Sequence, residues 1–84
     1  MVENFVRDLA KLIVSHPEDI AVERYNLAEK FDEIVIYAHK DDAGKLIGKD
    51  GHMINALKTL ISGCKAKDGI SYRMSVRTTR EHWD

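Results

Sequence analysis

Two glycines, three positions apart, enclose a lysine and an aspartate in the segment Gly48-Lys49-Asp50-Gly51. Because glycine lacks a Cβ, this spacing permits a tight turn whose backbone amides stay open to a ligand. The segment separates a short apolar stretch from a longer one of helical periodicity, so the N-terminus of a helix would add further donors. Together with the charge of Lys49, these donors predict a site for the phosphodiester backbone of a nucleic acid.

The residues beside this loop could extend the site. Lys45 is close enough in sequence to join Lys49, and His52 follows the loop directly. Ile47 and Ile54 are apolar and could support bases, although either could equally belong to the core. The candidate binding residues are therefore Lys45, Ile47, Gly48, Lys49, Asp50, Gly51, His52 and Ile54.

Two other glycine-rich phosphate motifs do not match. A P-loop needs four residues between its glycines and then Lys followed by Ser or Thr, whereas three residues separate Gly44 from Gly48 and Asp50 follows Lys49. A dinucleotide fingerprint needs Gly-x-Gly, and residue 46 is Leu. We also find no nucleophile–base pair, no paired carboxylates and no metal-ligand spacing among the four histidines, so we expect no enzyme, metal or cofactor.

The charge is unevenly distributed along the chain. The formal net charge is −1, from 13 basic and 14 acidic residues, but residues 44–67 hold five lysines against Asp50 alone. A local balance of +4 is typical of a phosphate-binding surface, although a solvated lysine-rich helix face would look the same. Because Asp50 opposes a phosphate at the centre of the loop, we expect weak and strongly salt-dependent binding.

Periodicity predicts the elements that position this loop. The first is a helix over 3–14, with Phe5, Leu9, Leu12 and Ile13 on its apolar face. Strands are predicted over 20–27 and 33–39, separated by a polar turn over 29–32. A short helix over 43–47, with Asp42 as its N-cap, comes before the loop. The last two elements are a helix over 52–65 with Cys64 in its apolar stripe, and an alternating strand over 70–77.

This order predicts an α+β fold in which a three-stranded sheet has its helices packed on one face. Eighty-four residues fit one domain, over 1–84, with its core over about 33–78. The longest apolar run is too short to cross a membrane, and we expect no secretory signal in the N-terminal sequence. A single cysteine cannot form an intrachain disulfide, which favours a cytoplasmic setting.

The apolar strand, the short helix, Ile-Gly-Lys-Asp-Gly, the long helix and the alternating strand together resemble a KH domain of the type II arrangement. As a whole, the chain is similar to the KhpA family of small bacterial RNA-binding proteins. This resemblance implies single-stranded RNA binding, with the Gly-x-x-Gly loop clamping the backbone of about four nucleotides. It also implies a homodimer, a KhpB/Jag-type RNA-binding partner, and a role as an RNA chaperone in cell-envelope and cell-length regulation.

The alternative is a KH-fold protein-interaction or dimerisation module with little RNA affinity of its own. Asp50 and the acidic N-terminal half favour this alternative, whereas Gly48, Gly51 and the lysine-rich segment favour RNA. Trp83, near the C-terminus, would be a partner contact if exposed and a terminal anchor if packed, and the sequence supports both.

Overall fold

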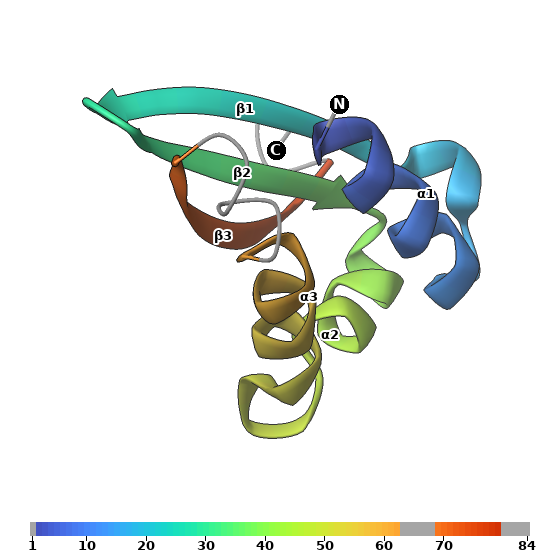
Figure 1. The fold of residues 1–84 in the computed structure, drawn as a ribbon. Helices are drawn as coiled ribbons and strands as arrows, with labels where there is room; N and C mark the ends of the chain where they lie inside the picture. The colour runs from blue at the N-terminus through green and yellow to red at the C-terminus, as the bar shows by residue number, and fades with distance from the viewer. Residues whose placement is uncertain (1, 63–68, 80–84) are drawn as a thin grey trace.

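The computed structural model describes residues 2–62 and 69–79 of the chain (Figure 1). Its elements are α1 (Val2–Ile13), the short turn η1 (Pro17–Asp19), β1 (Ala21–Ala28), β2 (Phe31–Ala38), α2 (Lys40–Ile47), the short turn η2 (Lys49–Gly51), α3 (His52–Ser62) and β3 (Ser71–Thr78). The order helix, strand, strand, helix, helix, strand confirms the predicted α+β class. None of the helices in these ranges is long and apolar enough to span a membrane.

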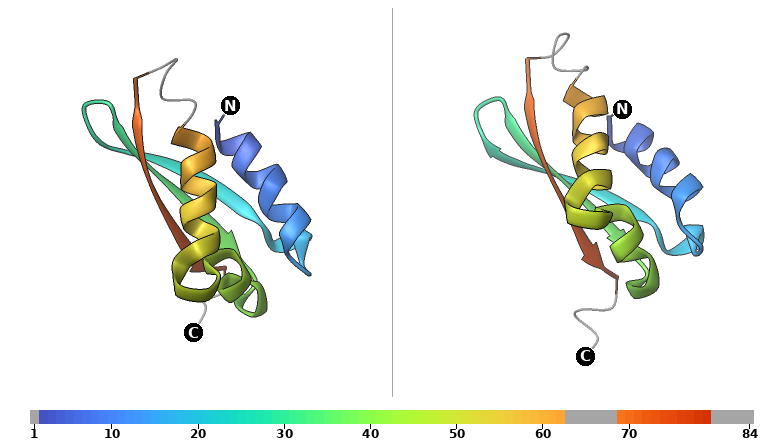
Figure 2. Two further views of the ribbon diagram at one scale, coloured as in Figure 1. Left: turned by 60° about the horizontal axis from the view of Figure 1, so that its bottom comes forward. Right: turned by 90° about the horizontal axis from the view of Figure 1, so that it is seen from below.

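The sheet has the order β1-β2-β3, with β2 in the middle. β1 pairs with β2 in the antiparallel sense, and β3 pairs with β2 in the parallel sense. A parallel pair needs a crossover connection, and α2 and α3 supply it. Figure 2 shows α1 and α3 lying side by side across one face of the sheet, with α2 at the end where α3 begins. The prediction that the helices occupy one face is confirmed.

The core lies between this sheet face and the three helices. Alternate residues of β2 point to one face of the sheet, so Ile34, Ile36 and Ala38 face the helices and are fully buried. Each helix and β3 add buried apolar side chains to this cluster, namely Val2, Val6, Ala10, Leu46, Leu57, Ile61 and Tyr72. Ile34, Val35 and Ile36 are all buried, so both faces of β2 are covered at its centre, which explains the apolar run there.

The predicted apolar face of α1 is wrong in part. Phe5 and Leu12 are 43% and 83% exposed, and α1 instead buries Val2, Val6 and Ala10. These three residues also repeat every four positions, so they form an equally continuous face. The small side chains of Val6 and Ala10 let the helix approach the sheet closely, and the larger Phe5 and Leu12 are left on the outside.

The polar turn predicted over 29–32 is shorter than expected, because β2 already begins at Phe31. Asp32 lies inside the strand and is buried, and its carboxylate accepts hydrogen bonds from Arg24 Nε at 2.7 Å and Asn26 Nδ2 at 2.8 Å. These bonds, from Asn26 and then Arg24, lower the pKa of Asp32. The predicted end of the long helix at residue 65, the placement of Cys64 and that of Trp83 all fall outside the described residues.

Asp42 is not the N-cap of α2 as predicted. The helix begins at Lys40, three residues earlier than predicted, and the side chain of His39 accepts the capping bond from the Asp41 amide. Asp42 is fully buried, and its carboxylate accepts bonds from the amides of Ser15 and His16 at 3.1 and 2.9 Å and from the His16 ring at 3.0 Å. Burial alone would raise the pKa of Asp42, but these bonds and that of Lys45 hold it well below its usual value.

We therefore expect Asp42→Asn to lower the thermal midpoint by about 5 °C or more at pH 7, the shift that removal of a buried hydrogen bond gives in a domain of this size. Because the folded pKa is depressed, the contribution of the carboxylate is complete above a pH of about 4, the pKa of an unfolded aspartate, and declines as the pH falls further. The difference in midpoint between the native chain and the variant should thus narrow between pH 4 and pH 2, as followed by circular dichroism. Asp8→Asn, at an exposed carboxylate of α1, is the control. A difference that stays constant down to pH 2 would show that the ionised carboxylate is not the stabilising species.

Candidate nucleic-acid interface

The loop between α2 and α3 has an unusual backbone. Gly48, Asp50 and Gly51 all have positive φ angles, of 77°, 57° and 76°. Gly48 combines its φ with a ψ of 172°, a region that is essentially restricted to glycine. Asp50 is in the left-handed helical region, which aspartate tolerates better than most residues do. Three of the four loop residues therefore have types that suit the conformation of the turn.

Gly48 is required by packing as well as by conformation. A Cβ at this position would lie 2.7 Å from both the amide nitrogen and the Cβ of Met53. A Cβ at Gly51 would meet only ordinary contacts, at 3.9 Å from Asn55 and 4.0 Å from Ile54. The first turn of α3 thus packs directly against the backbone at Gly48, and this contact sets the angle at which the chain leaves α2.

The loop uses some of its own amides. The Gly51 amide donates to the Gly48 carbonyl at 3.2 Å, and the His52 amide donates to the Lys49 carbonyl. Within residues 2–62 and 69–79, the amides of Lys49 and Asp50 have no hydrogen-bond acceptor. The loop therefore offers two backbone donors at its tip, from Lys49 and Asp50.

Lys45 and Lys49, which we expected to act together at the loop, have different surroundings in the structure. Lys49 is exposed at the loop tip and has no ion pair with any described residue, and Asp50 beside it is also exposed. Lys45 does not join them, because its ammonium donates to Ser15 Oγ at 2.5 Å and lies 3.4 Å from Asp42 Oδ1. Lys49 is thus the one lysine that the described part of the loop presents to a phosphate.

The apolar candidates lie on either side of the loop. Ile47, the last residue of α2, is 40% exposed, which is high for a large aliphatic side chain at the end of a helix. Ile54 is half-buried in the first turn of α3, next to Gly51. His52 begins α3 and is exposed. An apolar surface and an imidazole therefore adjoin the backbone donors.

A hollow of about 300 Å³ lies at the far end of α3, and the sequence did not indicate it. Its lining comes from α3, β3 and the start of β2, namely Phe31, Lys58, Ser62, Ile70, Ser71 and Tyr72. Ile54, Lys58 and Ser62 are spaced four residues apart, so they share one face of α3. This face leads from the glycine loop to the hollow, a distance of about 12 Å between its two ends.

A three-stranded sheet covered on one face by three helices, with a Gly-x-x-Gly loop joining the second helix to the third, defines a KH domain of the type II arrangement. The family model of the KhpA/KhpB KH domain matches residues 3–76. The chain belongs to this family.

Named relatives agree with this assignment. The RNA-binding protein KhpA of Halalkalibacterium halodurans is 28% identical over 74 residues, which cover 88% of this chain and 96% of that protein. The RNA-binding protein KhpA of Streptomyces coelicolor is 36% identical over 61 residues, covering 73% of this chain and 76% of that protein. A crystal structure of an Era variant from Aquifex aeolicus bound to GDP and AlF4− matches in fold, with a TM-score of 0.56 and 16% identity, over 92% of this chain and 29% of that one.

The two loop glycines should respond differently to the same substitution. Gly48→Ala places a Cβ against the backbone of α3 in a region that only glycine adopts readily, so we expect the free energy of unfolding to fall by about 2 kcal/mol or more. Gly51→Ala adds only the cost of a positive φ, about 1 kcal/mol. Urea unfolding followed by circular dichroism measures both. Equal decreases would mean that the contact between Gly48 and Met53 does not constrain the loop.

Proposed function

We propose that this chain binds single-stranded RNA through the loop Gly48-Lys49-Asp50-Gly51 and the adjoining face of α3. The observation that carries the proposal is the loop itself, where two backbone amides without acceptors stand beside an exposed lysine that has no ion pair among the described residues. Donors of this kind bind a sugar–phosphate backbone without reading its sequence. The relatives named above as RNA-binding proteins support RNA as the ligand.

The roles of the neighbouring residues follow from their positions. Lys49 and the amides of Lys49 and Asp50 would hold phosphates, while Ile47 and Ile54 support the bases and His52 contacts a base or phosphate. Lys58 and the hollow beyond it would receive the strand at the other end of α3. Lys45, held by Ser15 and Asp42, would contribute only at longer range.

Asp50 reduces the affinity of the site but suits its conformation. Its carboxylate repels a phosphate at the loop tip, yet aspartate and asparagine are among the few residues other than glycine that adopt its left-handed backbone readily. An asparagine at this position would keep the conformation and remove the charge. The contribution of this charge can therefore be separated experimentally from that of the backbone.

The wider role rests on the family. We propose a binding protein without catalytic residues or cofactor that acts in the cytoplasm as an RNA chaperone. A KhpB/Jag-type RNA-binding protein would be its partner, and regulation of the cell envelope and cell length its setting.

An exposed apolar stripe on α1 favours a second role in self-association. Phe5 and Leu12 are seven positions apart on one side of the helix and are 43% and 83% exposed, and Leu60 on α3 is 54% exposed. Apolar side chains at such spacing form the contact surface of many helix-mediated dimers. We propose that the chain forms a homodimer through α1, in addition to binding RNA.

Two loop variants that change the local charge in opposite directions test the RNA proposal. We expect Lys49→Asp to weaken binding of a labelled single-stranded RNA roughly tenfold at low salt, because it removes a charge-assisted hydrogen bond to a phosphate. Asp50→Asn should strengthen binding, because it removes a repulsive charge and keeps the backbone. Fluorescence anisotropy measures both affinities over a series of salt concentrations.

Lys40→Asp is the matched control, since it makes the same charge change at the exposed opposite end of α2. The plot of log affinity against log salt should become shallower, its slope decreasing in magnitude by about 0.7 for each phosphate that Lys49→Asp no longer neutralises. The slope should stay unchanged in Asp50→Asn. If Lys40→Asp and Lys49→Asp weaken binding equally, the protein responds to net charge and the loop is not the RNA site.

Light scattering coupled to size-exclusion chromatography tests the homodimer. We expect the native chain to be dimeric at tens of micromolar and Leu12→Glu to be monomeric, because the charge would be buried in the interface. Leu27→Glu, at a 44% exposed leucine of β1, should remain dimeric. A monomeric native chain, or a dimeric Leu12→Glu variant, would contradict an interface on α1.

A further inference from the structure

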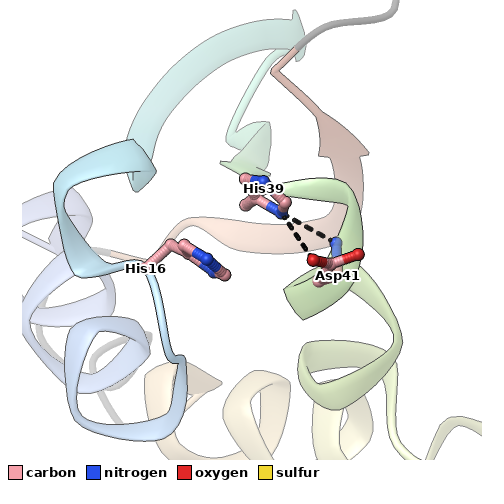
Figure 3. A group of neighbouring side chains, drawn as sticks. All are labelled: His16, His39 and Asp41. Atoms are coloured by element: carbon pink, nitrogen blue, oxygen red, sulfur yellow. Dashed lines mark hydrogen bonds and ion pairs between the residues drawn. The ribbon is translucent and has the colours of Figure 1, made fainter.

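Two histidines that are far apart in the sequence meet at the start of α2. His16 follows α1 and His39 comes directly before α2, and their rings are stacked with centroids 4.0 Å apart and planes inclined by 13°. Figure 3 shows both rings beside Asp41, in the first turn of α2. One donor atom from each of the three side chains lies within 4.8 Å of the other two. We expected no metal site from the sequence, because spacing along the chain does not reveal this cluster.

The buried carboxylate of Asp42 determines where His16 carries its proton. His16 Nδ1 lies 3.0 Å from Asp42 Oδ2, and the same oxygen accepts the His16 amide at 2.9 Å, so it is an acceptor for this residue. Nδ1 must therefore donate, and in the neutral ring the lone pair lies on Nε2. Histidines that bind metals are typically held in this way, with one ring nitrogen donating to a carboxylate and the other free for the ion.

His39 and Asp41 are placed to supply the other two ligands. His39 Nδ1 accepts the Asp41 amide at 3.0 Å and lies 3.6 Å from Asp41 Oδ2. Its single lone pair is therefore directed at the amide and would have to leave this capping bond to bind an ion. Two ligands at about 2.0–2.1 Å from a tetrahedral zinc ion lie about 3.4 Å apart, so the separation of these two atoms suits one ion once the His39 ring has turned. The side chain of Asp41 is 65% exposed, and solvent can reach it.

The charges around the cluster favour a cation. Asp41 and Asp42 contribute two negative charges, and Lys45, 3.4 Å from Asp42 Oδ1, contributes one positive charge. Mg²⁺ and Ca²⁺ prefer oxygen ligands, whereas imidazole nitrogens suit zinc, nickel, cobalt and copper.

We propose that His16, His39 and Asp41 bind one divalent transition-metal ion, with Zn²⁺ as the reference ion and water completing its coordination. The two rings must rotate from their stacked arrangement for both lone pairs to converge on the ion. Bound metal would join the segment after α1 to the start of α2, the same two segments that Asp42 holds together. The cluster lies at the opposite end of α2 from the glycine loop, about 12 Å away, so this inference does not depend on RNA binding.

Isothermal titration calorimetry of the tag-free chain with zinc chloride tests the site. The variants are chosen to preserve the fold: His39→Ser keeps an N-capping oxygen, His16→Asn keeps an N–H donor for Asp42, and Asp41→Asn changes an exposed side chain. We expect one ion per native chain and at least about tenfold weaker binding in each variant. His52→Ala serves as the metal-binding control, because it removes a histidine at the other end of α2.

A second measurement follows the thermal midpoint with and without zinc. Zinc should raise the midpoint of the native chain and of His52→Ala, the rise should disappear with EDTA, and Asp41→Asn should show little of it. Binding to His16→Asn and Asp41→Asn with native affinity would place the ion elsewhere and overturn the proposal. Absence of zinc binding to the folded native chain at millimolar zinc would overturn it as well.

Discussion

The buried carboxylate of Asp42 joins the segment after α1 to α2. A carboxylate removed from water is tolerated only when its oxygens accept hydrogen bonds, and the chain after α1 supplies them from Ser15 and His16. Lys45 adds a positive charge from the next turn of α2. The amides of Ser15 and His16 after α1 and the ammonium of Lys45 on α2 all contact this carboxylate, and together they orient α2 against α1. α2 is only eight residues long and the glycine loop begins directly after it, so the position of the loop depends on this interaction.

The loop combines requirements that few residue types can meet. Gly48 must lack a Cβ because α3 packs against its backbone, whereas Gly51 needs only conformational freedom. Asp50 meets the conformational requirement at the expense of electrostatic attraction for a phosphate. Lys49 compensates for that charge from the same exposed tip. As a phosphate site, the loop would have an affinity set by these two adjacent charges, and its shape is set by the packing of α3 against Gly48.

Family membership and site chemistry carry different information about this chain. The match to the KhpA/KhpB KH domain establishes the fold and where to look for a nucleic-acid site. The histidine cluster at the start of α2 and the exposed apolar stripe of α1 belong to the particular side chains found here. Together they give this small domain three candidate binding surfaces: the loop, the cluster at the other end of the same helix, and the outer face of α1.

Local sequence determined the element order, the position of the glycine loop and the alternation of β3, because each depends on periodicity or on glycine within a few residues. It did not determine which face of α1 is buried, since Val6 and Ala10 compete with Phe5 and Leu12 and only the distance to the sheet decides between them. Whether Asp42 caps its own helix or binds the end of α1 also required the tertiary structure, because its donors lie 26 and 27 positions away in the sequence. Contacts between distant segments arise from packing, which no local pattern encodes.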